Sequence, residues 1–256
     1  MKLIKLLLKK IFRHKFSIYI RNLIGVRPPI ILLNLNKKNI STSDAFFWRT
    51  DNSYHTIFKF SDILNLFFKD NSSEVEILFY DKNNKLIKSK KLLNIELSNK
   101  LVIDRNFLDG LEDYGVFYIF HKSKSNINSI IRNSCYTGYS YKENLPSFVH
   151  GNLITSAKNF DGTHEDFGIA SLSTFKKMMY KVQNFYNFDK TEIAIMNPTK
   201  NNLEIEINSN KFILRSCCSK IINVYNNELI EIVSNCYLLR PIIFNYKKQF
   251  IDVYHG

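Results

Sequence analysis

The sequence has few of the residues that break or cross-link a chain: 8 glycines, 5 prolines and 4 cysteines in 256 residues. The cysteines form no C-x-x-C pair and lack metal-ligand spacing, so no cysteine-built zinc site is indicated. We expect reduced thiols in the cytoplasm, with a single Cys135–Cys236 disulfide as the open alternative. No G-x-S-x-G, P-loop or dinucleotide glycine fingerprint occurs, so none of these enzyme motifs indicates a reaction.

Acidic residues are missing from the first 43 positions, which hold ten lysines and arginines. Asp44 is the first carboxylate, and the rest of the chain carries 26 basic and 23 acidic side chains. The net charge of +13 therefore belongs mainly to the N-terminal segment. Because a nucleic-acid-binding body would carry a basic face of its own, we expect no nucleic-acid partner.

Long hydrophobic runs are also missing, and the N-terminal segment is too interrupted by charge for a membrane span or a signal peptide. Its spacing predicts a basic amphipathic helix that ends near Gly25. We expect it to lie on an anionic membrane surface, at the inner face of the membrane. Packing on the protein's own body or on a partner protein are the alternatives. The expected membrane contacts are Lys2, Lys5, Leu7, Leu8, Lys9, Ile11 and Arg13.

Polar and apolar residues alternate in two similar stretches, residues 74–93 and residues 202–224. Each contains a hairpin turn rich in Asn and Lys and is followed by further alternating segments. This pattern predicts half-buried antiparallel strands in two related units. If the units are related, Val75 should correspond to Leu203 and Leu101 to Ile221, all with inward side chains.

The phrase "NPTKNNLEIEI…SKIINV" resembles the first strands of immunoglobulin-like and fibronectin-III-like modules. The resemblance covers residues 45–122 and 175–256 and rests on the spacing of strands and turns, not on a diagnostic residue. Trp48 lacks the flanking cysteines of an immunoglobulin domain. It implies a mainly β fold of two antiparallel β-sandwich modules after an N-terminal amphipathic helix. The expected parts are helix and linker (1–43), first module (44–131), junction loops and strand (132–168), and second module (169–256).

The junction, residues 132–168, holds four of the eight glycines and a cluster of tyrosines. Function often resides in loops held by a rigid scaffold, so we expect the ligand site here. Tyr139 and Tyr141 would form an exposed stacking platform, with Tyr136 turned inward. Gly138 and Gly151 would let a ligand approach the backbone. The predicted ligand-binding residues are Arg132, Tyr139, Tyr141, His150 and Asn152.

A metal site at the same junction is the alternative. His150, His164 and Glu165 could hold zinc with one open position, although their spacing alone does not select a metal. Arg240 is expected to be buried and structural, with Asp252 as its partner.

Together these features predict a non-catalytic, membrane-peripheral binding or accessory protein without a cofactor. Its ligand would be a glycan or another protein, in connection with surface-glycan assembly. The alternative is a metal-dependent enzyme with its site at the module junction.

Overall fold

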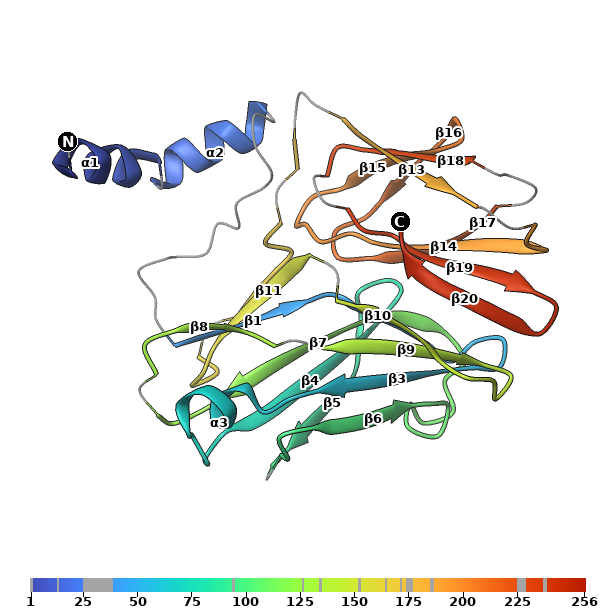
Figure 1. Ribbon diagram of the computed structural model, residues 1–256, viewed down its shortest axis with the longest axis horizontal. Coiled ribbons are helices and arrows are strands. Elements are labelled where there is room, and N and C mark those ends of the chain that lie inside the picture. Colours follow the sequence, from blue (N-terminus) through green and yellow to red (C-terminus); the bar gives the residue numbers. More distant parts are fainter. Residues whose placement is uncertain are drawn as a thin grey trace.

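The protein is mainly β, as the sequence predicts (Figure 1). A computed structural model describes residues 2–12, 14–24, 39–93, 95–125, 127–133, 135–151, 153–163, 165–170, 172–173, 177–184, 187–224, 229–236 and 239–256. Within these ranges the strands form five sheets of four strands each. Nearly all strand pairs are antiparallel, in keeping with the short turns rich in Asn, Asp and Lys.

The N-terminal segment forms two helices, α1 (Lys2–Phe12) and α2 (Lys15–Ile24), where a single helix was expected. Arg21 joins them: its Nη2 donates to the Phe12 carbonyl at 2.7 Å, and its guanidinium lies 3.6 Å from the centre of the Phe12 ring. Within the part of the chain that the structure describes, no helix is long and apolar enough to cross a membrane.

In the first half of the molecule, two sheets face each other across an aromatic and aliphatic core. The β7 sheet has the order β2-β7-β4-β5, and the β3 sheet has the order β10-β9-β3-β6. Their strands are β2 (Phe46–Arg49), β3 (Tyr54–Phe60), β4 (Glu74–Asp81), β5 (Leu86–Leu92), β6 (Asn99–Ile103), β7 (Tyr114–Lys122), β9 (Tyr136–Tyr141) and β10 (Ser147–His150). Alternate residues point inward, among them the fully buried Phe58, Ile77 and Phe117.

One short helix, α3 (Ile63–Phe68), follows β3 in this half. Asp62 caps its first turn by accepting a hydrogen bond from the Asn65 amide, as the N-cap position requires.

The second half repeats the arrangement with aliphatic side chains. The β18 sheet has the order β13-β18-β15-β16, and the β14 sheet has the order β17-β14-β19-β20. Their strands are β13 (Met178–Gln183), β14 (Lys190–Met196), β15 (Leu203–Ile207), β16 (Asn210–Leu214), β17 (Ser219–Val224), β18 (Leu229–Ser234), β19 (Ile242–Lys247) and β20 (Phe250–His255). Ile193, Ile205 and Ile232 are buried between the sheets.

The two halves share one strand order. When the eight strands of each half are numbered along the chain, both halves give one sheet of order 1-6-3-4 and one of order 8-7-2-5. Val75 and Leu203, which the sequence aligns, are both fully buried in the core of their own half. The similar alternation in the two stretches therefore corresponds to a similar order of strands.

The second predicted correspondence is wrong by one residue. Leu101 packs on the core of the first half, but Ile221 packs on the neighbouring core between the halves. Ile222 packs on the core of the second half instead. Because side chains on a strand alternate with period two, a shift of one residue moves every side chain to the other face.

A third core lies between the halves, where the outer face of the β7 sheet meets the outer face of the β14 sheet. Phe47 and Tyr118 of the first half are buried there with Ala194 and Phe244 of the second. The opposite outer face, on the β18 sheet, carries the ion pairs Lys177–Glu204, Lys181–Glu231 and Lys211–Glu206. The apolar faces are thus used between the halves, and the charged face is left to solvent.

Residues 132–168 contain more strand than expected. Strands β9 and β10 complete the β3 sheet, and the remaining strands belong to a fifth sheet of order β12-β11-β1-β8. Its members are β1 (Ile40–Asp44), β8 (Ile130–Arg132), β11 (Ile154–Asn159) and β12 (Glu165–Phe167). This sheet is tied to the β7 sheet by Lys158, whose Nζ lies 2.7 Å from Glu76 Oε2.

Candidate ligand-binding pocket between the two halves

A polar pocket of about 370 Å³ lies where the two halves meet. Strands β1, β8, β9 and β10 supply most of its wall, and the segment before β19 supplies the rest. Its volume falls within the range of small-molecule sites. The lining residues are Asp44, Arg132, Asn133, Cys135, Tyr136, His150, Gly151 and Arg240.

Asp44 and Arg132 form the charged centre of the pocket. Arg132 Nε donates to Asp44 Oδ1 at 2.8 Å, and its Nη2 donates to Oδ2 at 2.6 Å, which is the two-pronged geometry of a strong pair. Burial raises the pKa of the Asp44 carboxyl, and the charges of Arg132 and Arg240 partly oppose that rise. The hydrogen bond from Arg132 to Asp44 in turn raises the pKa of the guanidinium.

Gly151 makes room for this carboxylate. A Cβ at position 151 would lie 2.3 Å from Asp44 Oδ2 and 2.7 Å from the Phe46 ring. The second predicted glycine, Gly138, has a different role, because a Cβ there would meet the ring of Phe148 at 2.5 Å on the neighbouring strand. Gly151 thus lines the pocket, and Gly138 allows two strands to pack closely.

Tyr136 and His150 form the aromatic part of the wall. Their ring centres lie 4.7 Å apart, and Tyr136 is 47% exposed. The His150 carbonyl lies 2.9 Å from Nε2 of His255 on β20, so the second half contacts the edge of β10 at this point. Burial lowers the pKa of His255.

Arg240 is the contribution of the second half. The expectation that it is buried is wrong: its side chain is exposed and lines the pocket. Its charge acts on both Asp44 and His255. Asp44 and Arg240 lie 196 positions apart, and only the contact between the halves brings them to one pocket, so no local pattern indicated them.

Asn133 supplies a buried polar group to the same wall. Its Nδ2 donates to Nε2 of His121 at 2.7 Å and to the Ser61 carbonyl at 3.1 Å. Its Oδ1 is buried and has no hydrogen-bond partner among the described residues. Buried acceptors are normally satisfied, so this oxygen is an exception among the buried polar atoms described.

The predicted tyrosine platform is absent from this surface. Tyr139 is fully buried in the core between the halves, where its hydroxyl donates to the Phe47 carbonyl at 3.0 Å. Tyr141 is half-buried against the same core, with its ring 5.5 Å from that of Tyr246. The predicted alternation is right, but the two faces are reversed: the face with Tyr139 and Tyr141 turns inward, and Tyr136 turns outward.

The residues of the metal alternative are only partly described. Asn152 and His164 lie outside the described residues. Glu165 is exposed on β12 and pairs with Lys158 at 2.8 Å. Across the described ranges, no three His, Cys, Asp or Glu side chains come together in a way that could hold a metal ion. The four cysteines are free and buried.

The predicted membrane contacts lie on α1 and beside it. Lys5, Leu7, Leu8 and Ile11 are exposed. Arg13 lies outside the described residues, and the side chains of Lys2 and Lys9 are likewise not described. Further large apolar side chains of the helix pair are also exposed, namely Ile4, Phe16, Tyr19 and Ile24.

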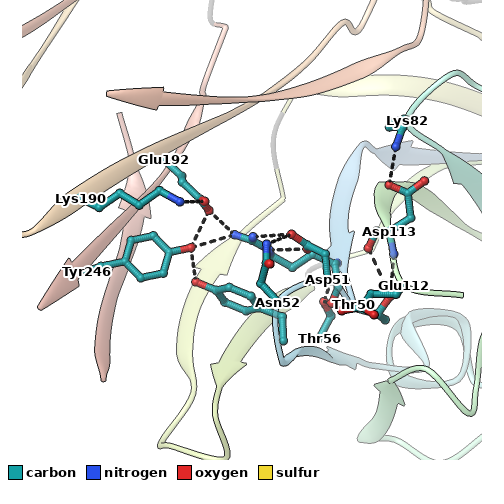
Figure 2. A network of polar contacts seen from close by, with 12 residues as sticks. Thr50, Asp51, Asn52, Thr56, Lys82, Glu112, Asp113, Lys190, Glu192 and Tyr246 are labelled. Atoms are coloured by element: carbon teal, nitrogen blue, oxygen red, sulfur yellow. Dashed lines mark hydrogen bonds and ion pairs between the residues drawn. The ribbon is translucent and has the colours of Figure 1, made fainter. Parts of the chain in front are cut away.

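A buried polar network joins the halves next to their shared core (Figure 2). Arg49, at the end of β2, has no exposed side-chain surface, and its Nη1 donates to Glu192 Oε2 of β14 at 2.8 Å. Arg49 also forms a two-pronged pair with Asp51, with both distances at 2.9 Å. The network therefore connects a buried charged group of the first half to a buried carboxylate of the second.

Glu192 collects three donors in this network. Besides Arg49, it accepts hydrogen bonds from the Tyr246 hydroxyl and from Lys190 Nζ, each at 2.5 Å (Figure 2). Burial alone would raise the pKa of Glu192, but the charge of Arg49 and these hydrogen bonds outweigh it and lower the pKa. The Tyr54 hydroxyl extends the chain by donating to Tyr246 at 2.7 Å.

Comparison of the chain with protein-family models, with curated proteins and with solved structures gives no match.

Proposed function

We propose that the protein is a non-catalytic binding protein that lies on an anionic membrane surface through α1 and α2. The observation that supports this most is the set of large apolar side chains on the helix pair, which includes Leu7 at 60% and Phe16 at 67% exposure. Exposed apolar residues gathered on one element favour an interaction site. The ten basic and no acidic residues of the first 43 positions favour an anionic partner.

The membrane explains both features together. Leu and Ile side chains gain free energy among acyl chains, while each lysine near an anionic surface contributes about 1 kcal/mol. Packing on the protein's own body would have buried these side chains, yet only Ile18 is buried among the helix residues whose burial is described. We place the protein at the cytoplasmic face, where anionic lipids are concentrated.

The body behind the helices is, in this proposal, a tandem of two related β-sandwich modules. The shared strand order and the separate cores of the halves support it. The likeness to immunoglobulin-like modules lies in the layers and not in the connections. In an immunoglobulin domain the sixth strand, F, pairs with the last strand, G. Here the sixth strand of each half, β7 or β18, pairs with the first strand of that half, β2 or β13.

The pocket between the halves is the proposed binding site, and a surface glycan or one of its precursors is the proposed ligand. The charged pair, the exposed ring of Tyr136 and the amide of Asn133 support a polar, ring-shaped ligand. A carbohydrate matches this mixture because it offers hydroxyl donors and acceptors around a ring whose C–H face can pack on an aromatic side chain.

The membrane part can be tested by co-sedimentation with vesicles. The intact chain should bind vesicles that contain anionic lipid, and binding should weaken as salt is raised, because salt screens the lysines. A variant that lacks residues 1–27 should stay in the supernatant and keep a β-rich far-ultraviolet spectrum. Binding that survives this deletion would contradict the proposal.

A further inference from the structure

We propose that the pocket between the halves selects a sugar that carries one anionic group, a carboxylate or a phosphate. The inference builds on the proposed function only in taking this pocket as the binding site. It adds a chemical class of ligand and assigns Arg240 as the residue that selects it.

Among the described residues of the pocket, one cation has no ion-pair partner. Arg132 and Asp44 neutralise each other through two hydrogen bonds of 2.8 and 2.6 Å. The guanidinium of Arg240 forms no hydrogen bond or ion pair with any residue that the structure describes, although it lines the same wall. A guanidinium binds carboxylate and phosphate groups through paired hydrogen bonds. The remaining charge therefore favours an anion.

The rest of the wall suits a sugar ring better than a small inorganic anion. Tyr136 presents a half-exposed ring beside His150, which gives a flat surface of moderate polarity. Asn133 adds a polar amide side chain to the same wall. A volume of about 370 Å³ is also far larger than an inorganic anion needs.

The pocket is complete only when the halves are in contact. Arg240 comes from the second half, and the other lining residues come from strands and connections of the first half and the fifth sheet. A ligand that contacts both sides binds the assembled form and should therefore stabilise the contact between the halves. Thermal stabilisation by ligand thus gives a second readout beside affinity.

Isothermal titration of the full chain, in the absence of vesicles, tests the inference. The probes are glucuronate and glucose 6-phosphate as anionic sugars, glucose as the neutral sugar, and acetate and inorganic phosphate as anions without a ring. We expect at least one anionic sugar to bind at least tenfold more tightly than glucose and than the matching free anion, and to raise the melting temperature.

Two arginine variants localise the binding. Arg240→Gln should weaken binding of the anionic sugar about tenfold or more, because it removes a charged hydrogen-bond donor. Arg215→Gln is the matched control, since Arg215 is also exposed but contacts Asn83 away from the pocket. It should leave binding unchanged. Equal effects of the two variants would overturn the role of Arg240.

The outcomes separate this inference from the proposed function. Equal affinity for glucose would overturn the requirement for charge, and equal affinity for free phosphate or acetate would overturn the requirement for a sugar. If none of the sugars binds while the chain still binds vesicles, the ligand class is wrong and the membrane proposal stands. If an anionic sugar binds but vesicles do not, the membrane proposal fails and this inference stands.

Discussion

Arg49 Nη1 lies 2.8 Å from Glu192 Oε2, across the contact between the two halves, and neither side chain is more than 5% exposed. The pair is surrounded by aromatic rings, with the Arg49 guanidinium 3.7 Å from the centre of the Tyr54 ring. A charge in such a place is stable only with its partner present. We therefore expect the pair to contribute to the contact between the halves.

Removing one member of this pair should be costly. Glu192→Gln leaves Arg49 paired with Asp51 but removes its charged partner from the second half, so we expect a loss of about 1.5–3 kcal/mol in the free energy of unfolding. Chemical denaturation of wild type and variant measures the difference.

The matched control is Glu204→Gln, which removes one member of the exposed pair Lys177–Glu204. Exposed pairs contribute about 0–1 kcal/mol, so this variant should unfold almost like the wild type. A cost at Glu192 as small as that at Glu204 would show that the halves do not depend on the buried pair.

Acid should also weaken the fold through His121. Its side chain is fully buried beside Asn133, and burial lowers its pKa from 6.5 to about 4. Between these values the unfolded chain takes up a proton that the folded chain does not, so stability falls as the pH drops from 6.5 to 4. The full effect of this one group is about 3 kcal/mol.

Unfolding free energies measured at several pH values between 7 and 4 test this expectation. His121→Gln should flatten the pH dependence, and His14→Gln, at an exposed position, should leave it unchanged. His255, whose pKa burial also lowers, accounts for part of the slope that remains. An unchanged slope in His121→Gln would mean that this histidine is accessible to protons.

Tyr139 should behave as a core residue. Tyr139→Ala removes a fully buried ring and should cost about 3–5 kcal/mol, whereas Tyr139→Phe loses only the hydrogen bond to Phe47 and should cost about 1 kcal/mol. Tyr136→Ala, at a half-exposed position, is the control and should change the melting temperature little. A melting temperature unaffected by Tyr139→Ala would place this ring at the surface.

Local patterns predicted the strands well. The alternation at residues 203–207 is that of a half-buried strand, as observed, whereas β4 at residues 74–81 is buried on both faces because its second face lies in the core between the halves. The polar turns after both strands give the hairpins β4–β5 and β15–β16. Even the repetition of strand order follows from the repeated sequence of strands and turns. These features depend on neighbours along the chain, which a sequence displays directly.

Features that depend on distant residues were not predictable in the same way. Alternation shows that Tyr139 and Tyr141 share a face, but it does not show which face a second pair of sheets will cover. The lining of the pocket was likewise only partly predictable. Arg132 and His150 were expected there, whereas Asp44 and Arg240 join them only through tertiary contacts. Charged residues at such contacts carry no periodic signal.

Vesicle binding by a full-length variant with Leu7→Asp and Leu8→Asp tests the central claim most directly, with Leu145→Asp as a control at an exposed apolar residue of the body. If α1 lies on the membrane, the double variant should lose binding to anionic vesicles and keep the melting temperature of the wild type in solution, and the control should bind normally. If the double variant instead binds vesicles as the wild type does, or if its melting temperature falls because α1 packs on the body, the account is contradicted.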